Sequence, residues 1–190
     1  HELEDPQFAA NPPNRCYYCK LELFRQLKQI AREKGIGNVV DGSNYDDLND
    51  YRPGMRAAAE LEVRHPLQEA QLTKDEIRVL SKEMGLPTWN KPPLACLASR
   101  FPYGIPITRE SLITVEEGEA FLHSLGIGQL RLRHHDKTAR IEVEPQDMRL
   151  LLKEQNRHRI IARFKELGYL YITLDLTGYR SGSLNEGIAR

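Results

Sequence analysis

The sequence predicts an α/β protein in two parts, a sheet domain over residues 1–105 and a small α+β domain over residues 106–190. Three observations support this division. In the first part, helical apolar spacing surrounds a short apolar run that is typical of a buried strand. In the second part, two stretches of alternating apolar residues lie between helical patterns, as in a hairpin flanked by helices. Between the parts, prolines interrupt every periodic pattern and the composition changes near residue 105.

The composition of the 190-residue chain narrows the class of protein. It has 27 basic and 27 acidic side chains and no net charge, whereas nucleic-acid binders usually carry a basic excess. The sequence has no apolar run long enough to span a membrane and no secretory signal pattern. Three cysteines do not make a disulfide framework, so a cytoplasmic, reducing setting is expected. Because the chain begins at His1 and not at methionine, we expect it to be the later part of a longer protein.

The first part begins with a polar, proline-rich stretch at residues 1–13, which is typical of a loop. Apolar residues then recur at three- and four-residue spacing over residues 16–34, which predicts an amphipathic helix that Gly35 ends. Residues 38–41 (NVVD) predict a short buried strand, and an Asn-, Asp- and Gly-rich loop at 42–54 follows it. Loops that follow a strand in α/β proteins often bind ligands.

A second helix is predicted to begin after Thr73. Thr73 and Glu76 match the S/T-x-x-E capping box, which satisfies the backbone N–H groups at a helix start. Gly85 and Pro87 end the helix, and a proline-interrupted loop continues to about residue 106. The apolar stripe of this helix consists of Ile77, Leu80 and Met84.

The second part has the predicted element order α-β-β-α-β. Thr108 caps the first helix and Gly126 ends it. Two stretches alternate like the strands of a hairpin, and Pro145 begins the second helix. The predicted elements are a helix at 109–124, strands at 130–133 and 139–144, a helix at 145–167 and a strand at 169–176.

Cys16 and Cys19 form a CxxC pair at the start of the first predicted helix, and Cys96 is the third cysteine. The N–H groups and the dipole of a helix N-terminus favour thiolates, which assists metal binding and nucleophilic attack alike. A structural zinc site needs four ligands, and no histidine lies at ligand spacing from these cysteines. A thioredoxin-like redox pair needs a βαβ frame ahead of the CxxC, where this sequence has only a proline-rich stretch. A [4Fe-4S] cluster held by three thiolates fits the count and leaves one iron open, while an incidental CxxC with a buried Cys96 is the structural alternative.

Two pairs of residues are candidates for binding anions near helix starts or the third cysteine. Lys74 and Arg78 lie one turn apart at a predicted helix N-terminus, where they either contact phosphates or are solvated charges on an exposed face. Ser99 and Arg100 follow Cys96 closely and would place an anion-binding pair beside its thiol.

The predicted hairpin carries a third candidate. Arg131 and Arg133 are two residues apart, so they share one face of a strand and repel each other unless an anion lies between them. Glu142 and Glu144 share one face of the partner strand. A cross-strand ladder of salt bridges is therefore the structural explanation, and a phosphate or carboxylate ligand is the functional one.

Five stretches, which together cover essentially the whole chain in order, resemble the LarE-type sulfurtransferases. This family belongs to the PP-loop (N-type) ATP pyrophosphatases. The resemblance implies that residues 1–105 are the later part of a PP-loop sheet domain and that residues 106–190 bind substrate or serve oligomerisation. The family's S-G-G-x-D-S phosphate loop is absent, and the resemblance places it upstream of His1 with the first strands of the sheet. The stretches are RCYYCK, VVDGSNYDDLNDYRPG, HPLQEAQLTKDEIR, KPPLACLASRFPYG and LDLTGYRSGSLNE.

The resemblance implies ATP-dependent sulfur transfer to pyridinium-3,5-biscarboxylic acid mononucleotide, a step in making the nickel-pincer cofactor of lactate racemase. ATP with Mg²⁺ adenylates a ring carboxylate, and a sulfur nucleophile displaces AMP to leave a thiocarboxylate. Some members sacrifice the sulfur of the cysteine that matches Cys96. Others hold a [4Fe-4S] cluster with three cysteines and deliver a cluster-bound hydrosulfide, and the set Cys16, Cys19 and Cys96 matches this second kind. A sulfide donor and a homo-oligomer are implied as partners, and neither a membrane nor a nucleic acid is.

The resemblance also implies roles for individual residues. Lys74, Asn44 and Asp47, together with Asp46, fall on the ATP side. Cys16, Cys19 and Cys96 hold the cluster and are the catalytic residues. On the substrate side, the family's motifs match Ser99, Arg100, Glu119, Arg131, Arg133 and Glu142.

Three alternatives remain beside this function. Sacrificial donation from Cys96 predicts activity without Cys16 or Cys19 and a single turnover. A tRNA-thiolating enzyme predicts a basic surface and usually further zinc-finger cysteines, neither of which the sequence has. A non-catalytic, metal-stabilised binding module predicts bound zinc and no sulfide-dependent product.

Overall fold

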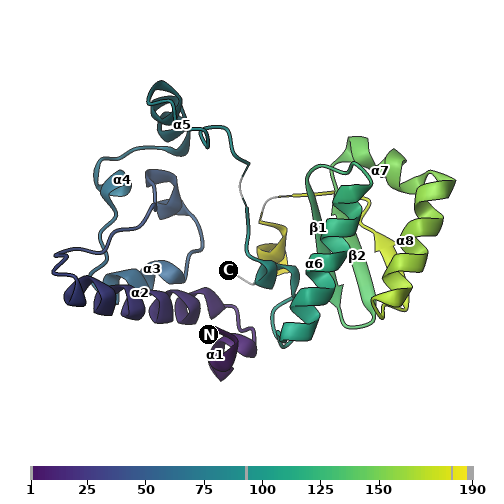
Figure 1. The fold of residues 1–190 in the computed structure, drawn as a ribbon, viewed down its shortest axis with the longest axis horizontal. Helices are drawn as coiled ribbons and strands as arrows, with labels where there is room; N and C mark the ends of the chain where they lie inside the picture. Colours follow the sequence, from purple (N-terminus) through teal and green to yellow (C-terminus); the bar gives the residue numbers. More distant parts are fainter. Residues whose placement is uncertain (1, 93, 181, 188–190) are drawn as a thin grey trace. The chain divides into compact units, whose positions relative to one another are not determined.

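The computed structural model describes residues 2–92, 94–180 and 182–187, and it divides the chain into two compact units. One unit consists of residues 14–94 with Glu2, and the other combines residues 3–13 with the chain from Ala95 onward. Figure 1 shows helices in both units and a sheet in the second. The mixed α/β character is confirmed, and the predicted domains 1–105 and 106–190 stay predictions.

The unit of residues 14–94 is built on the long helix α2 (Arg15–Glu33), which confirms the first predicted helix. Phe24 of α2 is 1% exposed and packs in a small core with Ala31, Val39, Ala58 and Val63. The shorter helices of this unit are α3 (Gly54–Glu60), α4 (Pro66–Glu69) and α5 (Lys74–Glu83).

The predicted strand at 38–41 is wrong as an element. The structure has a single parallel bridge there, between Val40 and Arg64, with Val39 buried and Val40 exposed. An extended pair this short does not form a stable ladder, because a sheet needs several strands with a buried face. Among the described residues, this bridge has no further strand beside it.

The capping box of the second predicted helix is confirmed, because Glu76 accepts from the N–H of Thr73 at 2.9 Å at the start of α5. None of the ten residues of α5 is buried. Two predicted loops are wrong in part, since both contain short helices. Residues 1–13 hold η1 (Glu2–Glu4) and α1 (Pro6–Ala9), and residues 42–54 hold η2 (Tyr45–Asn49).

The other unit contains a three-stranded sheet in the order β1-β2-β3. Strands β1 and β2 pair antiparallel, and β2 and β3 pair parallel, which confirms the predicted hairpin and the last strand. The single helix predicted at 145–167 is wrong, because Lys153 adopts an extended conformation (ψ 132°) and splits it. The elements are α6 (Arg109–Ser124), β1 (Leu130–His135), β2 (Thr138–Val143), α7 (Pro145–Leu152), α8 (Glu154–Glu166) and β3 (Tyr171–Leu174), with short η3 (Leu97–Arg100) and η4 (Ser183–Gly187).

The core of this unit lies between α6, α8 and the sheet. Leu122 of α6, Leu132 of β1 and Phe164 of α8 have no exposed surface. Gly118 lets α6 approach β1 closely, because an added Cβ would overlap the side chain of Leu132. The glycine is therefore required by packing and not by its backbone angles.

Residues 3–13 join this unit through a buried asparagine. The side-chain amide of Asn11, which has no exposed surface, donates to the carbonyls of Pro102 and Ile105 at 2.8 and 2.9 Å. In return, the N–H of Gly104 donates to the carbonyl of Asn11 at 2.9 Å. These bonds fix the chain just after the loop of Cys96.

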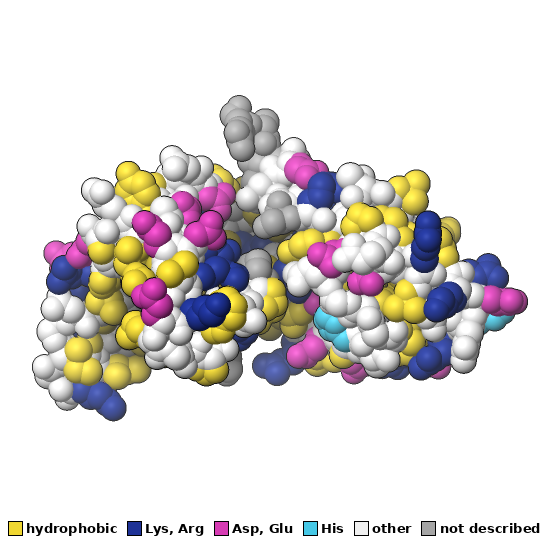
Figure 2. Space-filling view, turned by 90° about the horizontal axis from the view of Figure 1, so that it is seen from above, with side chains coloured by type: hydrophobic (Ala, Val, Ile, Leu, Met, Phe, Trp, Pro, Cys, Tyr) yellow, Lys and Arg dark blue, Asp and Glu magenta, His cyan; other side chains and the backbone are white. Residues whose placement is uncertain are grey.

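The surfaces of both units mix the two signs of charge with hydrophobic side chains, as Figure 2 shows for one face. In the described residues, no helix combines the length and the apolar character that crossing a membrane would require.

Gly118→Val is expected to lower the free energy of unfolding by about 1–3 kcal/mol, because the new side chain overpacks the contact with Leu132. Ala120→Val is the matched control, since Ala120 is exposed on the same helix and the exchange costs only about 0.7 kcal/mol of helix propensity. Urea unfolding of both variants measures the difference. Equal losses for the two would contradict the packing of α6 on β1.

Candidate functional site

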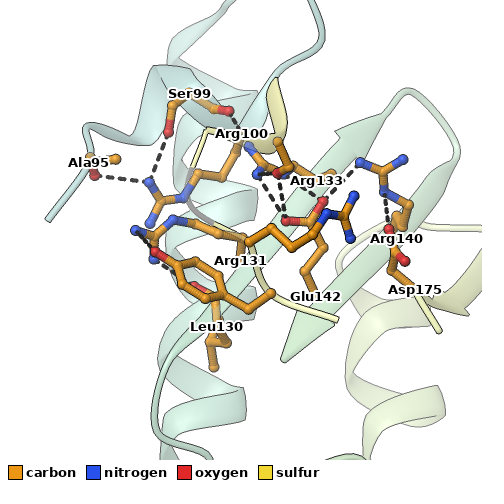
Figure 3. A network of polar contacts seen from close by, with 12 residues as sticks. Ala95, Ser99, Arg100, Leu130, Arg131, Arg133, Arg140, Glu142 and Asp175 are labelled. Atoms are coloured by element: carbon orange, nitrogen blue, oxygen red, sulfur yellow. Dashed lines mark hydrogen bonds and ion pairs between the residues drawn. The ribbon is translucent and has the colours of Figure 1, made fainter. Parts of the chain in front are cut away.

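Five buried charged residues form a cluster where η3, α6 and the β1–β2 hairpin meet, and Figure 3 labels four of them, Arg100, Arg131, Arg133 and Glu142. Arg131 and Arg133 lie on one face of β1, as their spacing predicts. The exposed fractions are 5% for Arg100, 8% for Glu119, 8% for Arg131, 5% for Arg133 and 0% for Glu142. The structure thus brings together five of the six residues predicted for the substrate side, and the sixth, Ser99, precedes Arg100 in η3.

Arg100 is paired within the protein. Its guanidinium makes two hydrogen bonds of 2.9 Å to the carboxylate of Glu119, which also accepts the backbone N–H of Leu132 at 2.9 Å. Its remaining donors reach the carbonyls of Ala95 and Cys96 at 2.9 and 3.0 Å. Arg100 therefore ties the backbone on both sides of the Ala95–Cys96 bond to α6 and β1. Sequence reasoning missed this role, because the partner lies 19 residues away.

Arg133 is also neutralised. It binds Glu142 through two hydrogen bonds of 3.0 and 2.8 Å, and it donates to the carbonyl of Ser99 at 2.7 Å. Glu142 accepts a further bond of 2.8 Å from Arg140. The cross-strand salt bridge is confirmed for Arg133 and Glu142, whereas Glu144 does not take part and accepts from Gln146 at 2.7 Å instead.

Arg131 differs from its neighbours because, among the described residues, no carboxylate pairs with it. It donates to the carbonyl of Leu130 at 2.7 Å, and its guanidinium lies 5.0 Å from the ring centroid of Tyr179. Burial lowers the pKa of Arg131, and the neighbouring charges of Arg100 and Arg133 lower it further. A guanidinium in this setting is stabilised by an anionic ligand.

The three cysteines are divided between the two units. Cys16 is exposed and Cys19 is half-buried in the first turns of α2, where Cys19 donates to the carboxylate of Glu2 at 3.1 Å. Cys96 is exposed and is the N-cap residue of η3 in the other unit. Within the part of the chain that the structure describes, no group of three or more His, Cys, Asp or Glu side chains is arranged to hold a metal. The three-thiolate cluster stays a prediction.

The residues predicted for the ATP side lie together in the unit of residues 14–94. Asn44 and Asp47 cap η2 reciprocally, and Asp47 forms a salt bridge of 2.8 Å with Arg52. Asp46 accepts the backbone N–H of Lys74 at 2.8 Å, so a carboxylate already binds the N-terminus of α5. A phosphate would therefore contact Lys74 through its exposed side chain. Their roles toward ATP stay predictions.

Arg78 is not a freely solvated charge, since it donates to the carbonyl of Lys91 at 2.9 Å. This bond ties α5 to the loop that follows it. It also removes part of the donor capacity that a phosphate site at Lys74 and Arg78 would use.

A cavity of about 310 Å³ adjoins Cys16 in the same unit. Lys20 of α2 lines it, and so do Asp41 and Ser43 from the segment after the Val40 bridge. Nδ1 of His65 lies 2.6 Å from the carboxylate of Asp41, and both side chains are largely buried. Burial raises the pKa of Asp41, but the N–H of Ser43 and the His65 ring more than offset it, so that the pKa lies below its ordinary value.

Three proteins are similar to this chain over at least nine-tenths of its length, and one of them has a stated activity. An uncharacterized protein of Synechocystis is 45% identical over 190 residues, which are the whole of this chain and 71% of that protein. The pyridinium-3,5-bisthiocarboxylic acid mononucleotide synthase of Lactiplantibacillus plantarum is 38% identical over 188 residues, or 99% of this chain and 67% of the synthase. The chain belongs to the LarE family. A second uncharacterized protein, from Methanocaldococcus jannaschii, is 36% identical over 92% of this chain and 68% of its own length.

A more distant relative agrees with the PP-loop resemblance of the LarE family. The tRNA-specific 2-thiouridylase MnmA of Desulforamulus reducens is 30% identical over a match that covers 46% of this chain and 29% of that enzyme. No family model matches the chain. Membership of the LarE family confirms the resemblance that the five motifs predicted, and the three-cysteine kind stays a prediction.

Asp41→Asn is expected to lower the free energy of unfolding by about 1–3 kcal/mol at pH 7, because it removes a charge that His65 and the Ser43 N–H stabilise. Since the folded-state pKa is depressed, this stability is fully present above the unfolded pKa of about 4. It is lost as the pH falls through the lower folded-state value.

Chemical unfolding of the wild type and Asp41→Asn at pH 7 and about pH 3 measures this difference. Asp50→Asn is the control, since the Asp50 side chain is 55% exposed. If the free energies of unfolding of the wild type and Asp41→Asn differ as much at about pH 3 as at pH 7, the ionised Asp41 is not the source of the stability.

Proposed function

We propose that the chain takes part in sulfur transfer to pyridinium-3,5-biscarboxylic acid mononucleotide, in which ring carboxylates become thiocarboxylates. The observation that carries this proposal is the 38% identity to the synthase of L. plantarum over almost the whole chain. The buried cluster of arginines supports it, because the phosphate of a mononucleotide would supply the negative charge that would neutralise Arg131.

The chemistry requires activation, because a carboxylate is a poor electrophile. In the proposed reaction, a carboxylate oxygen of the substrate attacks the α-phosphorus of ATP, and Mg²⁺-pyrophosphate leaves. A sulfur nucleophile then attacks the acyl carbon, the bond to AMP breaks, and a thiocarboxylate remains. Lys74 is the proposed contact to the phosphates of ATP, with Asn44 and Asp47 shaping the same side of the unit.

On the substrate side, we assign the phosphate of the mononucleotide to Arg131. Arg100 and Arg133 add positive potential, while Glu119 and Glu142 hold these two guanidiniums in place. Ser99 lies between the two pairs, because its carbonyl accepts from Arg133 and its hydroxyl accepts from Arg100 at 3.0 Å. Recognition by fixed guanidinium groups orients the substrate before the chemistry begins.

Cys16, Cys19 and Cys96 are the proposed ligands of a [4Fe-4S] cluster. Their chemistry fits, since thiolates are the usual ligands of such clusters and two of the three residues are exposed. A cluster held by these three thiolates would provide the sulfur nucleophile for the displacement of AMP. The chain itself fixes the position of Cys96, because Arg100 binds the backbone carbonyl of Cys96 while the thiol of Cys96 stays exposed.

The wider assignment follows the family resemblance. We infer that the product serves the nickel-pincer cofactor of lactate racemase, and that the protein works in the cytoplasm as a homo-oligomer with a sulfide donor.

A second candidate is thiolation of tRNA, which the partial identity to MnmA favours. The zero net charge of the chain argues against it, because phosphate contacts with a nucleic acid need a basic surface.

The direct test is conversion of the pyridinium dicarboxylate mononucleotide, followed by mass spectrometry. One arm supplies ATP, Mg²⁺ and sulfide, and the other supplies sulfide and the chemically prepared acyl adenylate, which bypasses activation. We expect replacement of carboxylate oxygen by sulfur in at least the second arm. Thiolated tRNA in place of this product, or no sulfur transfer in either arm, would overturn the proposed function.

The cluster is tested by iron and acid-labile sulfide analysis after anaerobic reconstitution. We expect roughly four of each per chain, with loss of both in Cys16→Ala, Cys19→Ala and Cys96→Ala. Leu97→Ala, next to Cys96, is the control that should retain the cluster. Bound zinc would favour a structural site. Activity of Cys16→Ala with a single turnover per chain would favour Cys96 as a sacrificial donor.

A further inference from the structure

The buried cluster of the second unit contains one positive charge more than its carboxylates neutralise. Three buried guanidiniums, those of Arg100, Arg131 and Arg133, stand against the two buried carboxylates of Glu119 and Glu142. The more exposed Arg140 does not alter this balance, because it is matched by Asp175 at 3.7 Å. Each of the two carboxylates makes a two-bond contact with an arginine other than Arg131.

Tyr179 occupies the position where a carboxylate would neutralise Arg131. The guanidinium carbon lies 5.0 Å from the centroid of the phenol ring, within the range of a cation–π contact. Nη2 of Arg131 also lies 3.4 Å from the phenol oxygen, and Nη1 donates to the carbonyl of Leu130. The ring fixes the orientation of the guanidinium and leaves its charge uncompensated.

The fold places Tyr179 there by a close backbone contact. The N–H of Tyr179 donates to the carbonyl of Val143, the last residue of β2, at 2.8 Å. Gly178 precedes it with φ +77°, and a Cβ at this position would lie 2.8 Å from the same carbonyl oxygen. The chain can therefore turn back onto the end of β2 only with glycine here, and this turn sets the phenol against Arg131.

We propose that Tyr179 is a positioning residue that holds Arg131 ready to bind the phosphate of the mononucleotide substrate. This inference rests on the proposed function and names the group that prepares its anion site. A carboxylate in place of the phenol would compete with the substrate phosphate for the guanidinium. An aromatic face stabilises the same cation without competing, because it presents no formal charge.

The test compares binding of nicotinic acid mononucleotide, a pyridinium ribose phosphate, with binding of its dephosphorylated riboside by calorimetry. Tyr179→Leu removes the ring and is expected to raise the Kd for the mononucleotide roughly tenfold, with little change for the riboside. Tyr179→Phe keeps the ring and is expected to change the Kd by less than about threefold. Tyr171→Leu is the control, because Tyr171 lies in the same unit on β3 and is 64% exposed.

Kinetics with the acyl adenylate supply the second measurement. A positioning role predicts that Tyr179→Leu raises KM and leaves kcat within about threefold, while the midpoint of thermal unfolding matches that of Tyr171→Leu. The inference is overturned if Tyr179→Leu binds the mononucleotide like the wild type, if mononucleotide and riboside lose affinity equally, or if the wild type shows no preference for the phosphate. A chain with no sulfur transfer but with a phosphate preference that depends on Tyr179 would reject the proposed function and keep this inference.

Discussion

The candidate site depends on the hydrogen bonds that the carboxylate of Glu119 accepts. It accepts two hydrogen bonds from Arg100 and one from the backbone N–H of Leu132, so a single buried group joins η3, α6 and β1. Burying a carboxylate and a guanidinium costs several kcal/mol of desolvation for each ion, which only good geometry and full hydrogen bonding offset. Each of the three hydrogen bonds that Glu119 accepts is 2.9 Å long. Removing Glu119 or Arg100 would leave the other as a buried charge without compensation.

This arrangement separates the positioning of Cys96 from its reactivity. Arg100 also donates to the carbonyls of Ala95 and Cys96, so its ion pair with Glu119 fixes the backbone of this loop to the core. The thiol itself remains exposed, as a ligand or nucleophile must be. A rigid backbone with an accessible side chain is what precise sulfur delivery needs, whichever source the sulfur has.

Helix starts and the hairpin could be predicted from the sequence, because they depend on residues that are close together in the chain. The capping box of α5, the Thr108 cap of α6 and the hairpin of β1 and β2 depend on residues a few positions apart, and all three are present. Partner choice across the fold could not be predicted in this way. Arg131 lies opposite Glu142 in register, yet Glu142 binds Arg133 diagonally, and Arg131 lies against Tyr179 instead. Periodicity also did not reveal the break at Lys153 or the reduction of the 38–41 strand to one bridge, because it records apolar spacing and not backbone angles or strand partners.

The two proposed anion sites use opposite solutions to the same electrostatic problem. At the N-terminus of α5, the carboxylate of Asp46 binds the backbone N–H of Lys74, so the protein satisfies that position itself and leaves only a side-chain ammonium for a phosphate. At β1, an aromatic ring takes the place of the carboxylate, and the guanidinium of Arg131 keeps its full charge. A buried charge that must bind a ligand has to be held without being neutralised, and Tyr179 does this for Arg131. Binding the substrate phosphate would then neutralise the excess positive charge of the buried cluster. The affinity for the phosphate therefore arises from a guanidinium charge that no carboxylate of the folded cluster neutralises.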